Sequence, residues 1–293
     1  MSYRFVTDYQ NNNLLRQSFF ELALATFDID FKPWFEIGAW DDNYRCYSYA
    51  DGDQIIANVS VNLMTVHHQG QKKQAVQIGT VMTHPDYQQQ GLAGKLMDHV
   101  VTHYDQRVAF IYLFANDQVL DFYPKYGFQP YDESQFTFAI DQQWQPLPKN
   151  YRQLNCESAS DLALLRELAF NRRPNSQRLG ISNNPSLLLF YATIVFPHQL
   201  YYFEKQHTLI IGEQSDDTIT IFDVVQTQKE AIKPLISQLI TNETTTGQLF
   251  FTTDNQEFPI EQQLQFTTED HLFIRSQSET WSNQTCFPLT SHG

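Results

Sequence analysis

The chain has 293 residues, which is enough for two domains of ordinary size. Hydrophobic residues make up 42% and aromatic residues 14%, so a sizeable core can be buried and general disorder is excluded. The formal net charge of −14 leaves no basic stripe to displace counterions, which excludes nucleic acid as the main partner. The same charge is compatible with a cationic substrate.

The cysteines and the N-terminal residues indicate where the chain works. Cys46, Cys156 and Cys286 are far apart and odd in number, as expected for free thiols in a reducing compartment. The N-terminus has no apolar signal core, and no run of about 18 apolar residues could span a bilayer. We therefore expect a cytoplasmic protein without a membrane partner.

Residues 1–145 predict a mixed α/β domain. Its expected helices cover residues 14–27, 31–40, 91–105 and a stretch that begins at Asn116. Its expected strands cover residues 3–7, 44–49, 54–66, 76–83, 107–114 and a final pair around 128–140. Asp51-Gly52-Asp53 is a hairpin turn signal between two of these strands.

A Gln- and Pro-rich stretch at 142–150 is typical of a linker and predicts a second domain over residues 146–293. Its expected helices cover residues 158–171, 185–196 and 229–240. Its expected strands cover residues 200–204, 208–213, 218–225, 248–252 and 271–275. The order of elements resembles that of the first half, although no matching glycine-bearing loop is present.

The sequence HPDYQQQGLAGKLM, residues 84–97, joins an expected strand to a strongly amphipathic helix. At such a helix start, unpaired backbone N–H groups and the positive end of the helix dipole make an anion site. Gly91 removes the Cβ that would block close approach, and Ala93 and Gly94 keep the first turn slim. The loop is neither a Walker loop nor a dinucleotide fingerprint, and a helix that merely begins with glycine is the alternative.

A second motif follows in LFANDQVLDFYPKYGF, residues 113–128. Asn116 and Tyr123 are seven residues apart, so two helical turns would place them on one side, about 10 Å apart along the axis. Asn116 also suits a helix N-cap. An amide and a phenol beside an anion-binding loop fit a long ligand that ends in a diphosphate. The alternatives are an ordinary cap for Asn116 and a core aromatic role for Tyr123.

The two motifs together resemble those of the GNAT-type, acetyl-CoA-dependent N-acetyltransferases. The first motif is Pro85, Gln88, Gly91 and Ala93, and the second is Asn116, Tyr123, Gly127 and Phe128. The motif match spans residues 76–128, and the order of elements extends it over residues 1–145. The resemblance implies a GNAT-like fold, an α/β mixed sheet, with a degenerate, related second domain as in two-domain members of the family.

The resemblance also implies roles for individual residues. Acetyl-CoA would be the cosubstrate, and no metal is expected. Its pyrophosphate would lie on the backbone N–H groups of Gln88, Gln89, Gln90, Gly91, Leu92, Ala93 and Gly94. The backbone of Val81, Met82 and Thr83 would pair with the pantetheine arm like an added strand, which requires the strands at 76–83 and 107–114 to splay apart near Gly79. Asn116 would bond the pantetheine, and Tyr123 would act as general acid toward the thiolate.

The catalytic base is the gap in this pattern. Acyl transfer needs a neutral amine, a stabilised oxyanion and a proton for the departing thiolate. Family members often carry a glutamate on the strand before the loop, but this strand offers Gln77, Gly79 and Thr83. Water, Glu36 or Asp41 could serve instead. Pro124, inside the expected helix, can kink it and turn Tyr123.

The sequence therefore predicts transfer of an acetyl group from acetyl-CoA to a primary amine, by direct attack through a tetrahedral intermediate. The acceptor is open: a small-molecule amine or a protein amine. An acyl-CoA-binding sensor without turnover is the alternative, which the missing acidic residue favours. The second domain would shape the acceptor cleft or mediate dimerisation, and the oligomeric state is open.

Overall fold

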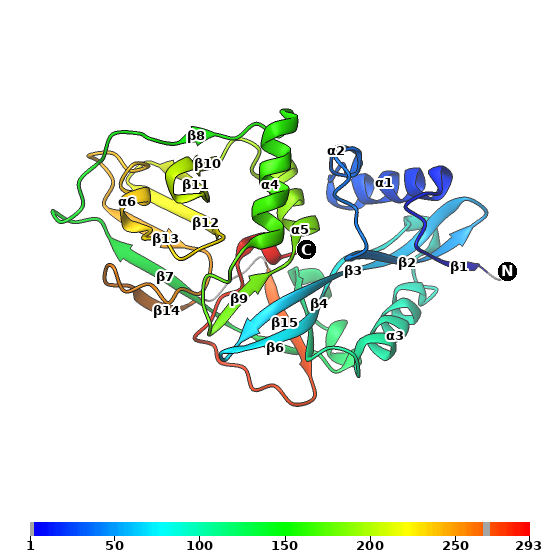
Figure 1. Ribbon diagram of the computed structural model, residues 1–293. Coiled ribbons are helices and arrows are strands. Elements are labelled where there is room, and N and C mark those ends of the chain that lie inside the picture. Colours follow the sequence, from blue (N-terminus) through cyan, green and yellow to red (C-terminus); the bar gives the residue numbers. More distant parts are fainter. Residues whose placement is uncertain (1–2, 266–269) are drawn as a thin grey trace.

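The computed structural model describes residues 3–265 and 270–293, which form two mixed sheets with helices packed around them (Figure 1). The strand order in the first sheet is β1-β2-β3-β4-β5-β15-β6, with β9 paired to β3. The order in the second is β14-β7-β13-β12-β11-β10-β8. A mixed α/β fold with two related halves, as the sequence predicts, is confirmed at this level.

The first half supplies most of the first sheet. Its strands are β1 (Arg4–Thr7), β2 (Tyr44–Asp51), β3 (Gln54–His68), β4 (Gln71–Thr83), β5 (Phe110–Ala115), β6 (Gln129–Tyr131) and β7 (Glu133–Ala139). Its helices are α1 (Asn13–Phe27), α2 (Lys32–Glu36) and α3 (Leu92–Tyr104). The Asn12 side chain caps α1 by accepting the N–H groups of Leu14 and Leu15. Asp28, in the left-handed conformation at φ 58°, ends the helix.

The second half repeats this plan with shorter elements. Its strands are β8 (Arg152–Gln153), β9 (Leu179–Ser182), β10 (Leu200–Phe203), β11 (Thr208–Ser215), β12 (Thr218–Gln226), β13 (Thr246–Leu249), β14 (Glu261–Gln265) and β15 (His271–Ser276). Its helices are α4 (Ala159–Asn171), α5 (Pro185–Phe190), continued by a π-turn at Tyr191–Val195, and α6 (Lys233–Ile236). The predicted helix over 229–240 is thus only a four-residue helix, and β8, β9 and β14 have no counterpart among the predicted strands.

Two strands cross the predicted boundary at residue 145, in opposite directions. β7, expected to close the first sheet, pairs with β13 and β14 in the second. β15, expected in the second, pairs with β5 and β6 in the first. The expectation that 128–140 forms a strand pair in one sheet is therefore wrong. Alternating patterns predict strands but not their partners, since any edge with the right register can accept them.

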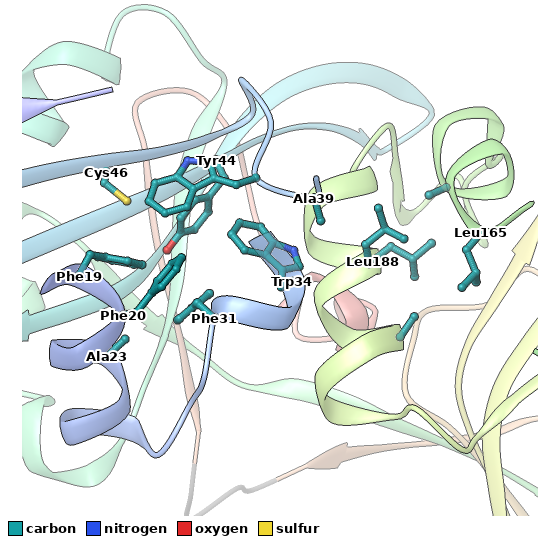
Figure 2. Close-up of a cluster of buried hydrophobic side chains, with 14 of the residues drawn as sticks. Phe19, Phe20, Ala23, Phe31, Trp34, Ala39, Tyr44, Cys46, Leu165 and Leu188 are labelled. Atoms are coloured by element: carbon teal, nitrogen blue, oxygen red, sulfur yellow. The ribbon is translucent and has the colours of Figure 1, made fainter. Parts of the chain in front are cut away.

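A shared hydrophobic core joins the halves. Phe19 and Phe20 of α1 pack with Phe31, Trp34 and Tyr44, and the same cluster includes Leu165 and Leu188 of α4 and α5 (Figure 2). The Trp34 Nε1–H donates to the Ser186 carbonyl at 2.9 Å. Burial of this much aromatic surface makes a separate first half unfavourable.

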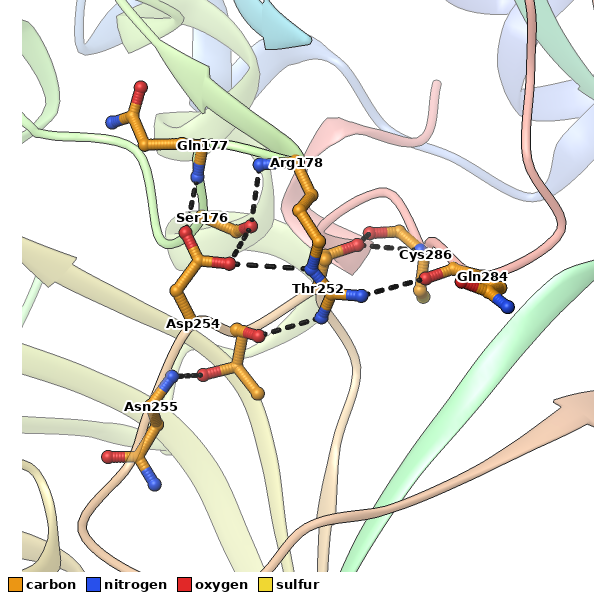
Figure 3. A network of polar contacts seen from close by, with 9 residues as sticks. Ser176, Gln177, Arg178, Thr252, Asp254, Asn255, Gln284 and Cys286 are labelled. Carbon is orange, nitrogen blue, oxygen red and sulfur yellow. Dashed lines mark hydrogen bonds and ion pairs between the residues drawn. The ribbon is translucent and has the colours of Figure 1, made fainter. Parts of the chain in front are cut away.

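A network of polar contacts links the two sheets at a second place (Figure 3). The Asp254 carboxylate accepts hydrogen bonds from the Ser176 hydroxyl and the Gln177 N–H, both at 2.6 Å. Arg178 donates to the carbonyls of Thr253 and Gln284. Because residues 176–178 lead into β9, which pairs with β3, this network ties the first sheet to the loops of the second.

The segment at 286–293 runs from the second sheet to the first. Its first residue, Cys286, lies beside the chain that follows β13, where the Cys286 carbonyl accepts the Thr252 N–H at 3.0 Å. It ends at β4 and β5, where the Tyr112 hydroxyl donates to the Ser291 carbonyl at 2.9 Å and Gln77 Nε2 to the Gly293 carbonyl at 3.3 Å. Residues far apart in the chain therefore meet in one place.

No helix in the described part of the chain is long and apolar enough to cross a bilayer.

Candidate active site

The loop before α3 presents a row of free backbone donors. Gly91 adopts φ 71° and Gln89 φ 61°, both in the left-handed region, so the chain turns sharply into the helix. No backbone N–H from residue 89 to residue 94 donates a hydrogen bond within the described chain, and the first bond of the helix is from the Lys95 N–H to the Gly91 carbonyl. An ideal Cβ at Gly91 would meet nothing within 4 Å. The helix start is open to an anion.

β4 and β5 pair over only four positions and then separate. Their parallel register runs from Ala75↔Phe110 to Ile78↔Leu113 and stops there. On the other side of β4, the register with β3 shifts between Asn58 and Ser60, opposite Gly79 and Met82. Thr80, inside this bulge, has φ 44°. The predicted splay is confirmed, although the strained residue is Thr80 rather than Gly79.

The splay forms a cavity of about 260 Å³, called here the β4–β5 opening. It gathers residues from both motifs, which are 22 or more positions apart in sequence. The predicted residues among its lining are Val81, Met82, Thr83, Ala93, Asn116 and Tyr123. The other predicted residues (Gln88, Gln89, Gln90, Gly91, Leu92 and Gly94) do not line it. The glutamines and Gly91 are exposed at the helix start, and the Leu92 side chain is buried in the core.

Asn116 and Tyr123 face the opening from two short turns, not from one helix. The stretch forms 3₁₀ turns at Asp117–Val119 and Tyr123–Tyr126, so the predicted helix from Asn116 is wrong. Pro124 has no N–H to continue the ladder, and Gly127 at φ 78° ends the second turn. The Asn116 Oδ1 accepts the Gln118 N–H at 3.1 Å, which leaves its amide N–H groups available.

Tyr123 is 6% exposed and packs against Phe122, Phe128 and Phe273. Burial raises the pKa of its phenol to about 12. Its ring therefore has the core contacts of a packing residue, while the residue also lines the β4–β5 opening. A phenol with this pKa stays protonated at neutral pH and is able to donate.

None of the candidate bases reaches the opening. Glu36 is exposed and pairs with Lys32 at 3.8 Å, and Asp41 accepts the Asn43 N–H at 2.8 Å. Gln77 is buried and accepts from the Asn62 amide at 2.7 Å. Among the described residues that line the opening, none carries a carboxylate in its side chain.

A second, larger cavity of about 400 Å³ adjoins the opening and is called here the aromatic cavity. Gly79, Thr80, Phe114 and Gly293 line both. The remaining lining residues of the aromatic cavity come from the α1–α2 region, β2, β3, α5 with its π-turn, and the 286–293 segment: Ile29, Phe31, Trp34, Tyr44, Asn62, Leu187, Phe190, Tyr191, Ile194, Val195, Phe196, Asp270, Leu289 and His292. Sequence analysis missed this cavity, because its walls come from distant parts of the chain.

Glycine is needed where the 286–293 segment meets β4. An ideal Cβ at Gly79 would lie 2.9 Å from the Gly293 carbonyl carbon, closer than any side chain tolerates. The sequence singles out Gly79 as a place of strand irregularity. Its contact with Gly293 has no local signal in the sequence.

Comparison with known proteins identifies the first half. Residues 15–131 match the family described as an acetyltransferase (GNAT) domain. The chain carries a GNAT acetyltransferase domain. The match covers both motifs and the strands that form the β4–β5 opening. An acyl-CoA cosubstrate and an amine acceptor are therefore implied. No curated protein matches the sequence significantly.

Solved structures resemble nearly the whole chain. A probable N-acyltransferase of Enterococcus faecalis, otherwise of unknown function, superposes with a TM-score of 0.61 at 15% identity, covering 94% of this chain and 72% of that one. Eis1 of Mycobacterium abscessus gives a TM-score of 0.58 at 14% identity, covering 94% and 74%. A GCN5-related N-acetyltransferase of Kribbella flavida gives 0.57 at 13% identity, covering 94% and 72%. These likenesses support a shared two-domain GNAT fold.

Proposed function

We propose that the chain transfers an acetyl group from acetyl-CoA to a primary amine, with residues 1–145 as the acetyl-CoA-binding catalytic domain and residues 146–293 as a degenerate second domain. The observation that carries this proposal is the β4–β5 opening, which collects residues of both motifs around one cavity beside the open start of α3.

Each part of the cosubstrate is assigned to a part of this site. The pyrophosphate lies on the N–H groups of residues 88–94, of which those of residues 89–94 are free, and the helix dipole favours negative charge there. The pantetheine extends along Val81, Met82 and Thr83 as an added strand, and the Asn116 amide donates to it. The acetyl group then lies near Tyr123, beside the aromatic cavity.

The reaction is derived from this placement. The amine nitrogen attacks the acetyl carbonyl carbon, and a C–N bond forms as the C–S bond breaks. A backbone N–H near Val81 stabilises the oxyanion. The sulfur leaves with the electron pair and takes a proton from the Tyr123 phenol, whose raised pKa keeps it protonated until then. The amine proton passes to water, because no Asp or Glu side chain lines the opening within the described chain, and water returns a proton to Tyr123.

The same lack of an acidic side chain supports a second function, an acyl-CoA-binding sensor without turnover. A panel of primary amines tests the two, with release of free thiol from acetyl-CoA as the readout. If the protein is an acetyltransferase, thiol release should depend on both the amine and the protein. Acetyl-CoA binding without release for any amine would favour the sensor.

A further inference from the structure

We propose that the aromatic cavity is the acceptor site and that it takes a primary amine attached to a single apolar or aromatic body, such as an arylalkylamine. This inference rests on the proposed function and names its substrate class.

The position of the cavity is the first argument. It meets the β4–β5 opening at Gly79, Thr80, Phe114 and Gly293, so an amine inside it faces the place assigned to the acetyl group. The other end of the cavity is bounded by the π-turn after α5. A substrate body can therefore fill the cavity while its amine points to the reacting carbon.

The walls are the second argument, because they are mostly apolar and rich in aromatic rings. Phe31 lies between Trp34, with ring centroids 5.6 Å apart, and Phe190, at 5.5 Å. Trp34 also packs edge-on against Tyr44 at 5.1 Å. The Trp34 Nε1–H and the Tyr44 hydroxyl are bonded to the protein, so both rings offer mainly apolar surface. A volume of about 400 Å³ lies within the range of small-molecule sites, about 300–1,000 Å³.

The charges are the third argument. No lysine or arginine lines the cavity among the described residues, so a carboxylate on the substrate would have no cationic partner there. This disfavours free amino acids. Asp270 is the one acidic side chain of the described lining, which is too few for the several positive charges of a polyamine or a sugar amine. Aromatic faces add attraction for a single cation.

One polar atom in the wall lacks a partner. His292 stacks on Phe114 with ring centroids 3.5 Å apart, and its Nε2 is buried without a hydrogen bond in the described chain. Burial also lowers the pKa of this imidazole to about 3, so the ring is neutral. A buried polar atom without a partner is costly, and an N–H of a bound amine would satisfy it.

The test compares 2-phenylethylamine, spermidine and glycine as acceptors, by thiol release and by direct calorimetric binding to the full chain. We expect 2-phenylethylamine to have a kcat/KM at least about tenfold above the other two, in line with the discrimination of apolar pockets. Preference for spermidine or glycine, with turnover intact, would overturn the substrate class while leaving the acetyltransferase standing.

Two variants place bulk in the cavity. Ile194→Trp narrows its interior, and Val195→Trp narrows its mouth at a residue that is 43% exposed, where added bulk spares the core. Both should weaken 2-phenylethylamine binding at least about tenfold, as loss of a pocket contact does, and leave acetyl-CoA binding unchanged. Thr193→Trp is the matched control, because Thr193 lies in the same π-turn but lines a different surface hollow.

The binding measurement separates the two levels of the account. In one outcome no amine releases thiol, but 2-phenylethylamine binds and the two cavity variants lose that binding. The assignment of the cavity as the amine site then stands, and the protein is a sensor rather than an enzyme. If 2-phenylethylamine neither binds nor reacts, or if Thr193→Trp impairs it as much as Ile194→Trp, the inference is wrong.

Discussion

The two halves of the chain build the same parallel strand pair and use it differently. In the first half, β4 and β5 pair over four positions before β4 bulges at Thr80. In the second, β12 and β13 also pair over four positions, from Thr218↔Thr246 to Ile221↔Leu249. Directly after them, β12 has one extra residue relative to its other neighbour β11, where the register shifts between Ile211 and Gly212. The bulge comes after the end of pairing in both.

The halves differ in the space beyond the bulge. The first opening is a cavity, with a thirteen-residue helix whose start carries free N–H groups. The second is filled by the chain itself. The Leu289 N–H donates to the Phe250 carbonyl at 3.0 Å, and Thr290 donates to Asp223, which is also paired with Arg172 at 2.8 Å. α6 has only four residues and no glycine at its start.

The same strand arrangement thus leaves a cavity in the first half, whereas in the second half the chain itself fills the equivalent place. The 286–293 segment occupies in the second half the place that a pantetheine arm is proposed to take in the first. The same segment then contributes His292 and Gly293 to the aromatic cavity beside the first opening. The segment that fills the second opening therefore also forms part of the wall of the aromatic cavity.

The largest effect should come from Gly91→Glu, which puts bulk and negative charge where the phosphates are proposed to bind. Acetyl-CoA at a hundredfold excess over its Kd should stabilise the native protein by about 2.7 kcal/mol, seen as a raised Tm, and the variant should lose this shift. Gly70→Glu is the control, since Gly70 also has a positive φ, 75°, and open space at its Cβ. A normal shift in Gly91→Glu would refute the loop assignment.

Tyr123→Phe should act next most strongly, on turnover alone. It keeps the ring against Phe128 and Phe273 but removes the proton donor, so kcat should fall by about 10²-fold. Acetyl-CoA affinity should change little. Tyr131→Phe, whose hydroxyl lies outside the opening, is the control. Full activity in Tyr123→Phe would make solvent the proton donor and Tyr123 a packing residue.

Thr290→Val tests the filled opening. The change removes a hydrogen bond to the buried Asp223 carboxylate while keeping side-chain size, and should lower the free energy of unfolding by about 1.5–3 kcal/mol, the usual value for a bond to a charged group. Thr245→Val removes a similar bond to an exposed aspartate, Asp217, and should cost less. Equal losses in a denaturant titration would mean that the segment contributes little to the second half.

The last prediction concerns pH. Glu133 accepts the Phe287 N–H at 2.7 Å, and burial raises its pKa to about 8. The folded state thus holds a proton that the unfolded state, with a pKa near 4.3, releases. The free energy of unfolding that this proton contributes is complete below the unfolded-state pKa of about 4.3. It is lost as the pH rises toward the folded-state pKa of about 8. Glu133→Gln should flatten this decline in Tm between about pH 5 and 8, and an unchanged decline would exclude Glu133 as its source.

The sequence predicts local features well and long-range ones poorly. The glycine at φ 71°, the amphipathic α3 and the splay after Ile78 depend on neighbouring residues, and so could be anticipated. The exchange of β7 and β15 between sheets could not, because alternation does not select a partner strand. The 3₁₀ turns after Asn116 show a single residue, Pro124, overriding a helical pattern.

The aromatic cavity, too, could not be predicted from the sequence. The loop and the second motif lie within 53 residues, the range 76–128, and carry their own signal. The cavity requires Trp34, Ile194 and His292 to meet, and only the shared core and the path of the 286–293 segment bring them together. Acceptor specificity therefore had no signature in the sequence.

Calorimetric titration of the full chain with acetyl-CoA tests the central claim most directly, namely that the first opening binds the cosubstrate and the second is filled by the chain itself. The account predicts one site per chain, lost in Gly91→Glu and retained in Gly70→Glu. Two sites per chain, or one site that survives Gly91→Glu unchanged, would contradict it.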